Sequence, residues 1–144
     1  ACRHLLRPAP VQGTAGEPAG MSLCVLAGGK TLVLAAAAFT LSWTHSVEKT
    51  RWTEHWRVTP AGLVVDMGRV EGSGAGMDPP EGSVFKNGGW EYRPKVPPLP
   101  KLVLAASGAT VGGWSLCVEG RPCLTLGVKE GPPISIEPCY EKTE

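Results

Sequence analysis

Glycine and proline divide this sequence into short segments. The chain contains 19 glycines and 14 prolines among 144 residues, about twice their usual combined share. Both residues interrupt helices, so a helical bundle or a coiled coil is excluded. The glycines follow no three-residue period, and 42% hydrophobic residues with five tryptophans are too many for a disordered chain. We therefore predict one compact domain of short elements joined by many turns.

The apolar segments between these breaks have the length of β-strands. They are 22–27, 31–37, 39–46, 52–59, 63–70, 90–93, 102–106, 114–118, 123–128 and 134–136. The pattern predicts an all-β fold, a single antiparallel β-sandwich or small barrel of about eight or nine short strands. The proline-rich segment 94–100 is expected to cross the surface as extended chain, and 71–87 to form a loop. Only the alanine-rich run 34–38 favours a helix instead.

The first 20 residues differ from the rest of the chain. They contain three prolines and three glycines without periodicity, which is typical of a flexible leader. We therefore divide the chain into a leader, 1–20, and an antiparallel β domain, 21–144. The longest nearly uncharged stretch, 21–44, is interrupted by Gly28-Gly29-Lys30, which favours two strands over a membrane-spanning helix. The alternative is that 31–43 is the apolar region of a signal peptide.

Charge and cysteine content limit the partners and the compartment. The net charge is +1 and the basic residues are scattered, so nucleic acid is not an expected partner. The cysteines at positions 2, 24, 117, 123 and 139 form no CxxC pair and have no zinc-finger spacing, so no cofactor is predicted. Cys117 and Cys123 flank a turn-like stretch and could form a short disulfide; the alternative is two reduced, buried thiols.

A second disulfide would leave one cysteine over. If Cys24 pairs with Cys139, Cys2 remains near the N-terminus, where a lipid could tether the protein to a membrane. Disulfides favour an oxidising compartment, so we expect an extracytoplasmic protein, either periplasmic or at the cell surface, secreted or lipid-anchored.

The segment 39–58 carries the most information about a site. A hairpin centred between residues 49 and 50, with a four-residue loop, would place His45 opposite Glu54. The same face would carry Trp43, Trp52 and Trp56, so this face would hold one ionisable pair among tryptophans. The pair could bind a polar ligand, transfer a proton or supply two metal ligands. The alternative is a satisfied polar link inside the core.

Catalysis and metal binding are the weaker interpretations of this pair. His55 projects from the opposite face, so no third metal ligand is evident. Ser46 alternates away from His45, which argues against a hydrolytic pair. We therefore predict neither a metal site nor catalytic residues. The Gly-rich stretch 72–77 could form an anion-binding nest, but it lacks the Gly-Lys-Ser/Thr end of a P-loop, and a plain flexible loop is the alternative.

A family resemblance rests on three pieces of this sequence. They are the segment 39–48 (Phe-Thr-Leu-Ser-Trp-Thr-His-Ser-Val-Glu), Glu54, and Gly74-Ala-Gly-Met77. Together they resemble the bacterial "domain of unknown function 1850" family, over roughly 21–93. The resemblance implies a small exported or membrane-anchored protein, often encoded beside TAXI-type tripartite (TRAP) transporters for organic acids. It also implies that His45, Ser46, Glu54, Gly74 and Gly76 are motif residues.

These observations predict an extracytoplasmic, non-enzymatic binding or accessory module. The ligand-binding residues are expected to be His45, Ser46, Glu54, Trp43, Trp52, Trp56, Gly74 and Gly76. By resemblance, the partner is a transporter component or a small carboxylate ligand. The alternative is a structural subunit of a surface assembly or filament, which would form homo-oligomers through its strand edges.

Overall fold

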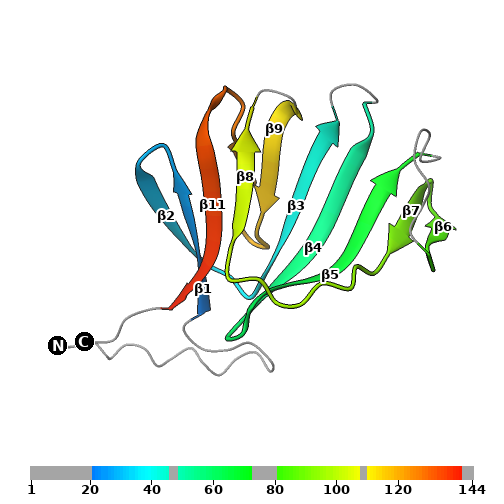
Figure 1. Ribbon diagram of the computed structural model, residues 1–144, viewed down its shortest axis with the longest axis horizontal. Coiled ribbons are helices and arrows are strands. Elements are labelled where there is room, and N and C mark those ends of the chain that lie inside the picture. Colours follow the sequence, from blue (N-terminus) through cyan, green and yellow to red (C-terminus); the bar gives the residue numbers. More distant parts are fainter. Residues whose placement is uncertain (1–20, 46–48, 73–80, 108–109, 141–144) are drawn as a thin grey trace.

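The chain folds as a β-sandwich of two antiparallel sheets (Figure 1). The computed structural model describes residues 21–45, 49–72, 81–107 and 110–140. Within these ranges it contains eleven strands and no helix. The predicted antiparallel sandwich is confirmed, whereas the expected number of strands, eight or nine, was too low.

The smaller sheet has four strands in the order β2-β1-β11-β8. Its strands are β1 (Met21–Ala27), β2 (Lys30–Ala35), β8 (Leu102–Ala106) and β11 (Gly131–Tyr140). The alanine-rich run 34–38 forms the end of β2 and the start of the next strand, so helix propensity does not decide its structure. The stretch 21–44 thus forms strands as expected, but three strands begin within it and not two.

The larger sheet has seven strands in the order β10-β9-β3-β4-β5-β7-β6. Its strands are β3 (Ala38–His45), β4 (Arg51–Thr59), β5 (Gly62–Glu71), β6 (Val84–Lys86), β7 (Gly89–Tyr92), β9 (Thr110–Cys117) and β10 (Leu124–Leu126). Strand β6 lies in the segment 71–87 that was expected to be a loop. It pairs with β7 and forms one edge of the sheet.

The hydrophobic core lies between the two sheets. Its fully buried side chains come from both of them and include Leu23, Ile136, Leu41, Val58, Leu63 and Leu116. Alternation along each strand directs these side chains inward. No residue of β6 or β7, both fully described, belongs to this core cluster.

The segment between β7 and β8 carries the chain from one sheet to the other. It contains the prolines of 94–100, is not part of a named strand, and runs along one end of the sandwich (Figure 1). The predicted crossing at this segment is thus present. Leu99 forms an isolated bridge with Leu63, and a Cβ on the adjacent Gly62 would lie 2.5 Å from the Leu99 carbonyl oxygen. Gly62 also has a φ of 130°, so this close approach needs glycine.

Two disulfides close the fold. Cys24 of β1 is bonded to Cys139 of β11, and Cys117 is bonded to Cys123. Both pairings that the sequence left open are therefore present, while Cys2 lies outside the described residues. Two disulfides are compatible with an oxidising, extracytoplasmic environment. In the described ranges, no helix is long and apolar enough to cross a membrane.

Candidate functional site

The β3–β4 hairpin does not have the register that we predicted from the sequence. Leu41, not His45, is the partner of Glu54. The backbone N–H of His45 instead donates a hydrogen bond of 2.9 Å to the backbone carbonyl oxygen of Thr50. Four residues, 46–49, therefore connect the paired positions, so the predicted loop length was right and its position was wrong by two residues.

Cross-strand stacking explains the observed register. Trp43 stacks on Trp52, with ring centroids 6.3 Å apart, and Phe39 stacks on Trp56 at 6.2 Å. The predicted register would have paired only Trp43 with Trp56. Because opposed aromatic pairs stabilise a hairpin by about 0.2–1 kcal/mol each, two stacked pairs favour the observed alignment over one.

The predicted His45–Glu54 pair is therefore not formed. His45 lies four residues along β3 from Leu41, the partner of Glu54, which corresponds to about 13 Å along the strand. His45 is exposed at the end of β3. In the described part of the chain, no group of three or more His, Cys, Asp or Glu side chains could hold a metal ion. Three other predicted site residues, Ser46, Gly74 and Gly76, lie outside the described residues.

The two faces of the hairpin separate as the sequence predicted. A shift of two residues in the position of the loop leaves every side chain on its original face. Trp43, Trp52, Glu54 and Trp56 consequently share the inner face of the seven-stranded sheet. The outer face carries polar partners instead, and the Arg51 guanidinium donates a hydrogen bond of 2.7 Å to Ser42 Oγ.

All five tryptophans of the protein lie on this inner face. Strand alternation and register place Trp43, Trp52, Trp56, Trp90 and Trp114 there. Trp114 contacts Trp43, with centroids 5.1 Å apart. Trp56 is buried, while the other four are partly exposed. We call the inner surface formed by these five tryptophans, Glu54 and Tyr92 the aromatic face.

Glu54 is the acidic group of the aromatic face. It lies on β4 between Trp52 and Trp56, and its Oε1 accepts a hydrogen bond of 2.9 Å from Trp56 Nε1. Burial raises the pKa of Glu54 above its usual range, and the hydrogen bond from Trp56 opposes this shift. Glu54 forms no ion pair with a lysine or arginine of the described chain.

Tyr92 reaches Glu54 across a glycine. Gly68 of β5 is the register partner of both Glu54 and Tyr92. A Cβ on Gly68 would lie 2.5 Å from Tyr92 Cζ, so the ring covers the glycine directly. Burial first, and then the negative charge of Glu54, raises the pKa of the Tyr92 phenol. Gly68 therefore allows the Tyr92 phenol to lie close to the Glu54 carboxyl group on the aromatic face.

A bulge in β5 places Gly68 on this face. The register with β4 shifts between His55 and Trp56, and Asp66 is the residue left without a partner. The bulge reverses the alternation of β5, so that Val65 before it and Gly68 after it both face inward. Simple alternation along β5 would have placed Gly68 on the outer face.

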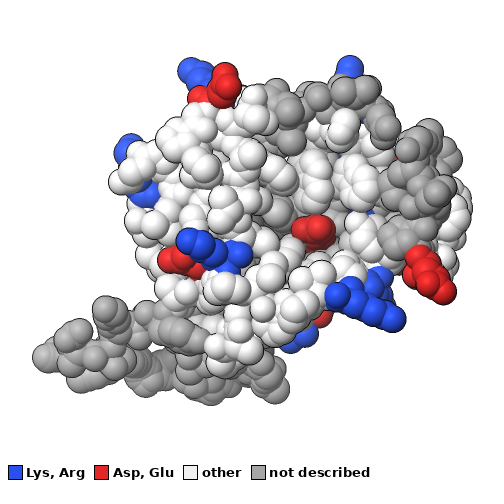
Figure 2. Space-filling model, viewed as in Figure 1, with Lys and Arg blue, Asp and Glu red and all other residues white. Residues whose placement is uncertain are grey.

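Part of the aromatic face extends past the smaller sheet. In Figure 1, β4, β5 and β7 continue to the right of β8 and β11. The surface over β4 is hollowed in Figure 2, and an acidic group appears there among uncharged atoms, with basic groups towards the periphery. The face is thus apolar and aromatic, and its charge is negative.

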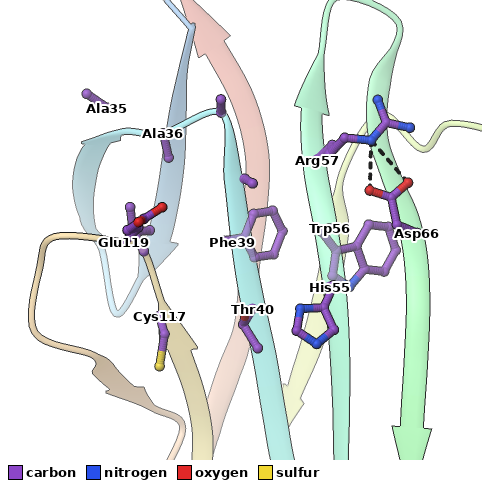
Figure 3. Close-up of a pocket in the computed structure, with 13 residues that line it drawn as sticks. Ala35, Ala36, Phe39, Thr40, His55, Trp56, Arg57, Asp66, Cys117 and Glu119 are labelled. Atoms are coloured by element: carbon purple, nitrogen blue, oxygen red, sulfur yellow. Dashed lines mark hydrogen bonds and ion pairs between the residues drawn. The ribbon is translucent and has the colours of Figure 1, made fainter. Parts of the chain in front are cut away.

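A separate cavity of about 460 Å³ lies near the connection between β2 and β3. His55, Arg57 and Asp66 line one side of it, and Glu119 lies on the other (Figure 3). Arg57 Nε lies 2.8 Å from Asp66 Oδ2, so their charges largely compensate each other. Both side chains are exposed, at 51% and 39%. Solvent therefore screens their charges, and a charged ligand would be attracted less strongly here than on the aromatic face.

The comparisons with known proteins identify a family. A family model described as "Domain of unknown function (DUF1850)" matches residues 39–126. The chain belongs to this family. No curated protein and no solved structure matches the chain.

The DUF1850 match covers the sheet that carries the aromatic face. Residues 39–126 run from the start of β3 to the end of β10. They contain nearly the whole seven-stranded sheet, whereas β1, β2 and β11 of the smaller sheet lie outside the match. The match begins later and ends later than the span 21–93 expected from the resemblance. All five tryptophans, Glu54, Gly68 and Tyr92 lie within it.

Four residues that form or position the aromatic face were not predicted from the sequence. They are Gly68, Tyr92, Trp90 and Trp114. An isolated glycine within a strand pattern, as at Gly68, indicates a bulge or a close approach, and this signal was available. The positions of Trp90 and Tyr92 depend on the pairing of β5 with β7, which no local pattern specifies.

Proposed function

We propose that this DUF1850 protein is an extracytoplasmic, non-enzymatic binding module whose ligand site is the aromatic face. One observation carries the proposal: all five tryptophans gather on one face of one sheet, around a partly buried carboxyl group. Tryptophans on a partly exposed surface supply large contact areas to a ligand. The two disulfides support the extracytoplasmic setting.

The finer role follows from the family resemblance. The resemblance implies an accessory function in organic-acid uptake beside a tripartite transporter, with a small carboxylate as one candidate class of ligand. The aromatic face itself supports binding of a small molecule in general. The test must therefore include ligands of both charges and neutral ligands.

Isothermal titration calorimetry tests the proposed site. Short-chain mono- and dicarboxylates, amines and neutral sugars are titrated into the wild-type protein and into Trp52→Leu and Arg57→Gln variants. We expect one ligand class to bind, and Trp52→Leu to weaken that binding about three- to tenfold. Arg57→Gln, on the opposite face of the same strand, should bind normally. A wild type that binds no class, or a Trp52→Leu variant with unchanged affinity, contradicts the proposal.

A non-enzymatic role has its own test. The ligand found by calorimetry is incubated with the protein and followed by one-dimensional NMR. Unchanged ligand signals are expected, since Glu54 and Tyr92 are the only side chains among the described residues of the aromatic face that can exchange a proton. Protein-dependent turnover that Glu54→Gln abolishes would instead make the protein an enzyme.

The open sheet edges favour a structural subunit as a second candidate function. Strand β2 forms one edge, with Leu32 and Val33 exposed, and β6 forms another, with Val84 and Phe85 exposed. Apolar edge strands can pair with further copies of the chain. Light scattering after size-exclusion chromatography separates the two functions. A binding module should keep the same low molar mass at all protein concentrations, whereas a filament subunit should form species of higher mass as the concentration rises.

A further inference from the structure

The aromatic face has a charge arrangement that differs from the rest of the protein. On the outer face of the seven-stranded sheet, Arg57 pairs with Asp66, and Arg69 pairs with Glu91 and Glu71. On the inner face, Glu54 has only the indole N–H of Trp56 as its hydrogen-bond donor among the described residues. A partly buried carboxylate without a cation is costly, because the protein interior solvates its charge poorly.

The neighbours of Glu54 reinforce the preference for positive charge. Trp52 and Trp56 flank it on β4, and Tyr92 lies across Gly68. The faces of aromatic rings are electrostatically negative, and they attract cations within about 6 Å of the ring centroid. A carboxylate ligand would meet both a second carboxylate and these ring faces.

These contacts complement a ligand with one positive charge and apolar substituents. An ammonium group could lie against Glu54, and methyl groups on its nitrogen could pack on the indole rings. Trp52 and Trp43 are both partly exposed and stack with centroids 6.3 Å apart, so they present an accessible aromatic wall beside Glu54.

We propose that the aromatic face binds a small organic ammonium cation, with Glu54 as the counter-ion and Trp52 and Tyr92 as cation–π partners. This inference rests on the proposed binding function and specifies its ligand class. It departs from the carboxylate suggested by the family resemblance.

Matched ligands test the charge requirement. Choline and its uncharged isostere 3,3-dimethyl-1-butanol have the same shape, so their affinities differ by the contribution of the charge. Both are titrated by calorimetry into the wild-type protein, with sodium chloride matching the ionic strength and succinate as the anionic probe. We expect choline to bind at least about tenfold more tightly than the isostere, and succinate not to bind.

Two variants assign the selectivity to Glu54. Glu54→Gln keeps an oxygen that can accept the Trp56 hydrogen bond, and it should weaken choline binding at least about tenfold and remove the preference over the isostere. Glu137→Gln is the matched control, because Glu137 is a partly buried glutamate in a strand of the other sheet. It should leave choline affinity unchanged. Near-ultraviolet circular dichroism verifies that each variant is folded.

The outcomes distinguish this inference from the proposed function. Equal binding of choline and its isostere, or unchanged choline binding by Glu54→Gln, overturns the cation assignment. Succinate binding that Trp52→Leu weakens, without choline binding, overturns the cation assignment and retains the binding module. Failure of choline and of every other ligand class to bind overturns both.

Discussion

Trp56 donates a hydrogen bond of 2.9 Å from its indole Nε1 to Oε1 of Glu54, two residues earlier on the same face of β4. Trp56 is 5% exposed and belongs to the core, so the hydrogen bond ties the acidic group of the aromatic face to the packed interior. The carboxyl group is thereby held in a fixed position beside Trp52.

Glu54→Gln should change how stability depends on pH. Burial raises the pKa of Glu54 in the folded protein above its ordinary value of 4.5. The folded wild type therefore binds more protons than the unfolded chain, and its stability falls as pH rises from that value through the folded pKa. The amide side chain introduced by Glu54→Gln does not titrate, so this contribution is absent from the variant. Relative to the wild type, the variant's free energy of unfolding in urea should therefore rise as the pH increases above 4.5. A wild type whose stability rises relative to the variant over this range contradicts the burial of this group.

Trp56→Phe should destabilise the protein by about 1–3 kcal/mol. The substitution keeps an aromatic ring but removes the N–H donor to Glu54. In a Glu54→Gln background the same change should cost less. Leaving a neutral amide oxygen without a hydrogen-bond donor costs less free energy than leaving a carboxylate without one. Guanidinium unfolding of the four proteins at neutral pH gives the coupling energy. Equal costs in both backgrounds would show that the charge of Glu54 adds nothing to the strength of this hydrogen bond.

Gly68→Ala should destabilise the protein by about 1–3 kcal/mol, because the new Cβ would lie 2.5 Å from Tyr92 Cζ. In a Tyr92→Ala background the ring is absent and the cost should largely disappear. Gly131→Ala is the control, since the nearest atom to its Cβ would be 4.0 Å away. Thermal unfolding of these variants measures the costs, and a Gly68→Ala cost that persists without the Tyr92 ring would place the strain elsewhere.

The two disulfides should contribute unequally to stability. Cys24 and Cys139 are 115 residues apart, and Cys117 and Cys123 are 6 apart. Chain entropy assigns about 5 kcal/mol to the longer loop and about 2 kcal/mol to the shorter one. Replacing each pair by serines and measuring urea unfolding compares them. A larger loss from the short loop would be inconsistent with the entropic origin.

Much of the fold was predictable because strand alternation is a local property. The faces of β3 and β4 were assigned correctly from the spacing of Trp43, Trp52 and Trp56 alone. Their register was not, because moving the loop by two residues leaves every face unchanged. Stacking of Phe39 on Trp56 decides the register, and this contact joins residues far apart in the sequence.

The rest of the candidate site depends on pairings that no local pattern contains. The bulge at Asp66 reverses the alternation of β5, which brings Gly68 and Val70 to the inner face. Strand β7 then pairs with β5 and supplies Tyr92 and Trp90. The short strand β6 (Val84–Lys86) follows a Gly-rich segment and has too few residues to show a periodic pattern.

Two-dimensional ¹H–¹⁵N NMR tests most directly whether the aromatic face is the binding site. The five tryptophans give five indole N–H signals, all of them from this face. Addition of choline should shift the indole signals of Trp52 and Trp56 most strongly, and Glu54→Gln should suppress these shifts. Shifts confined to the backbone amides of His55, Arg57 and Asp66, around the cavity near the β2–β3 connection, would contradict the account.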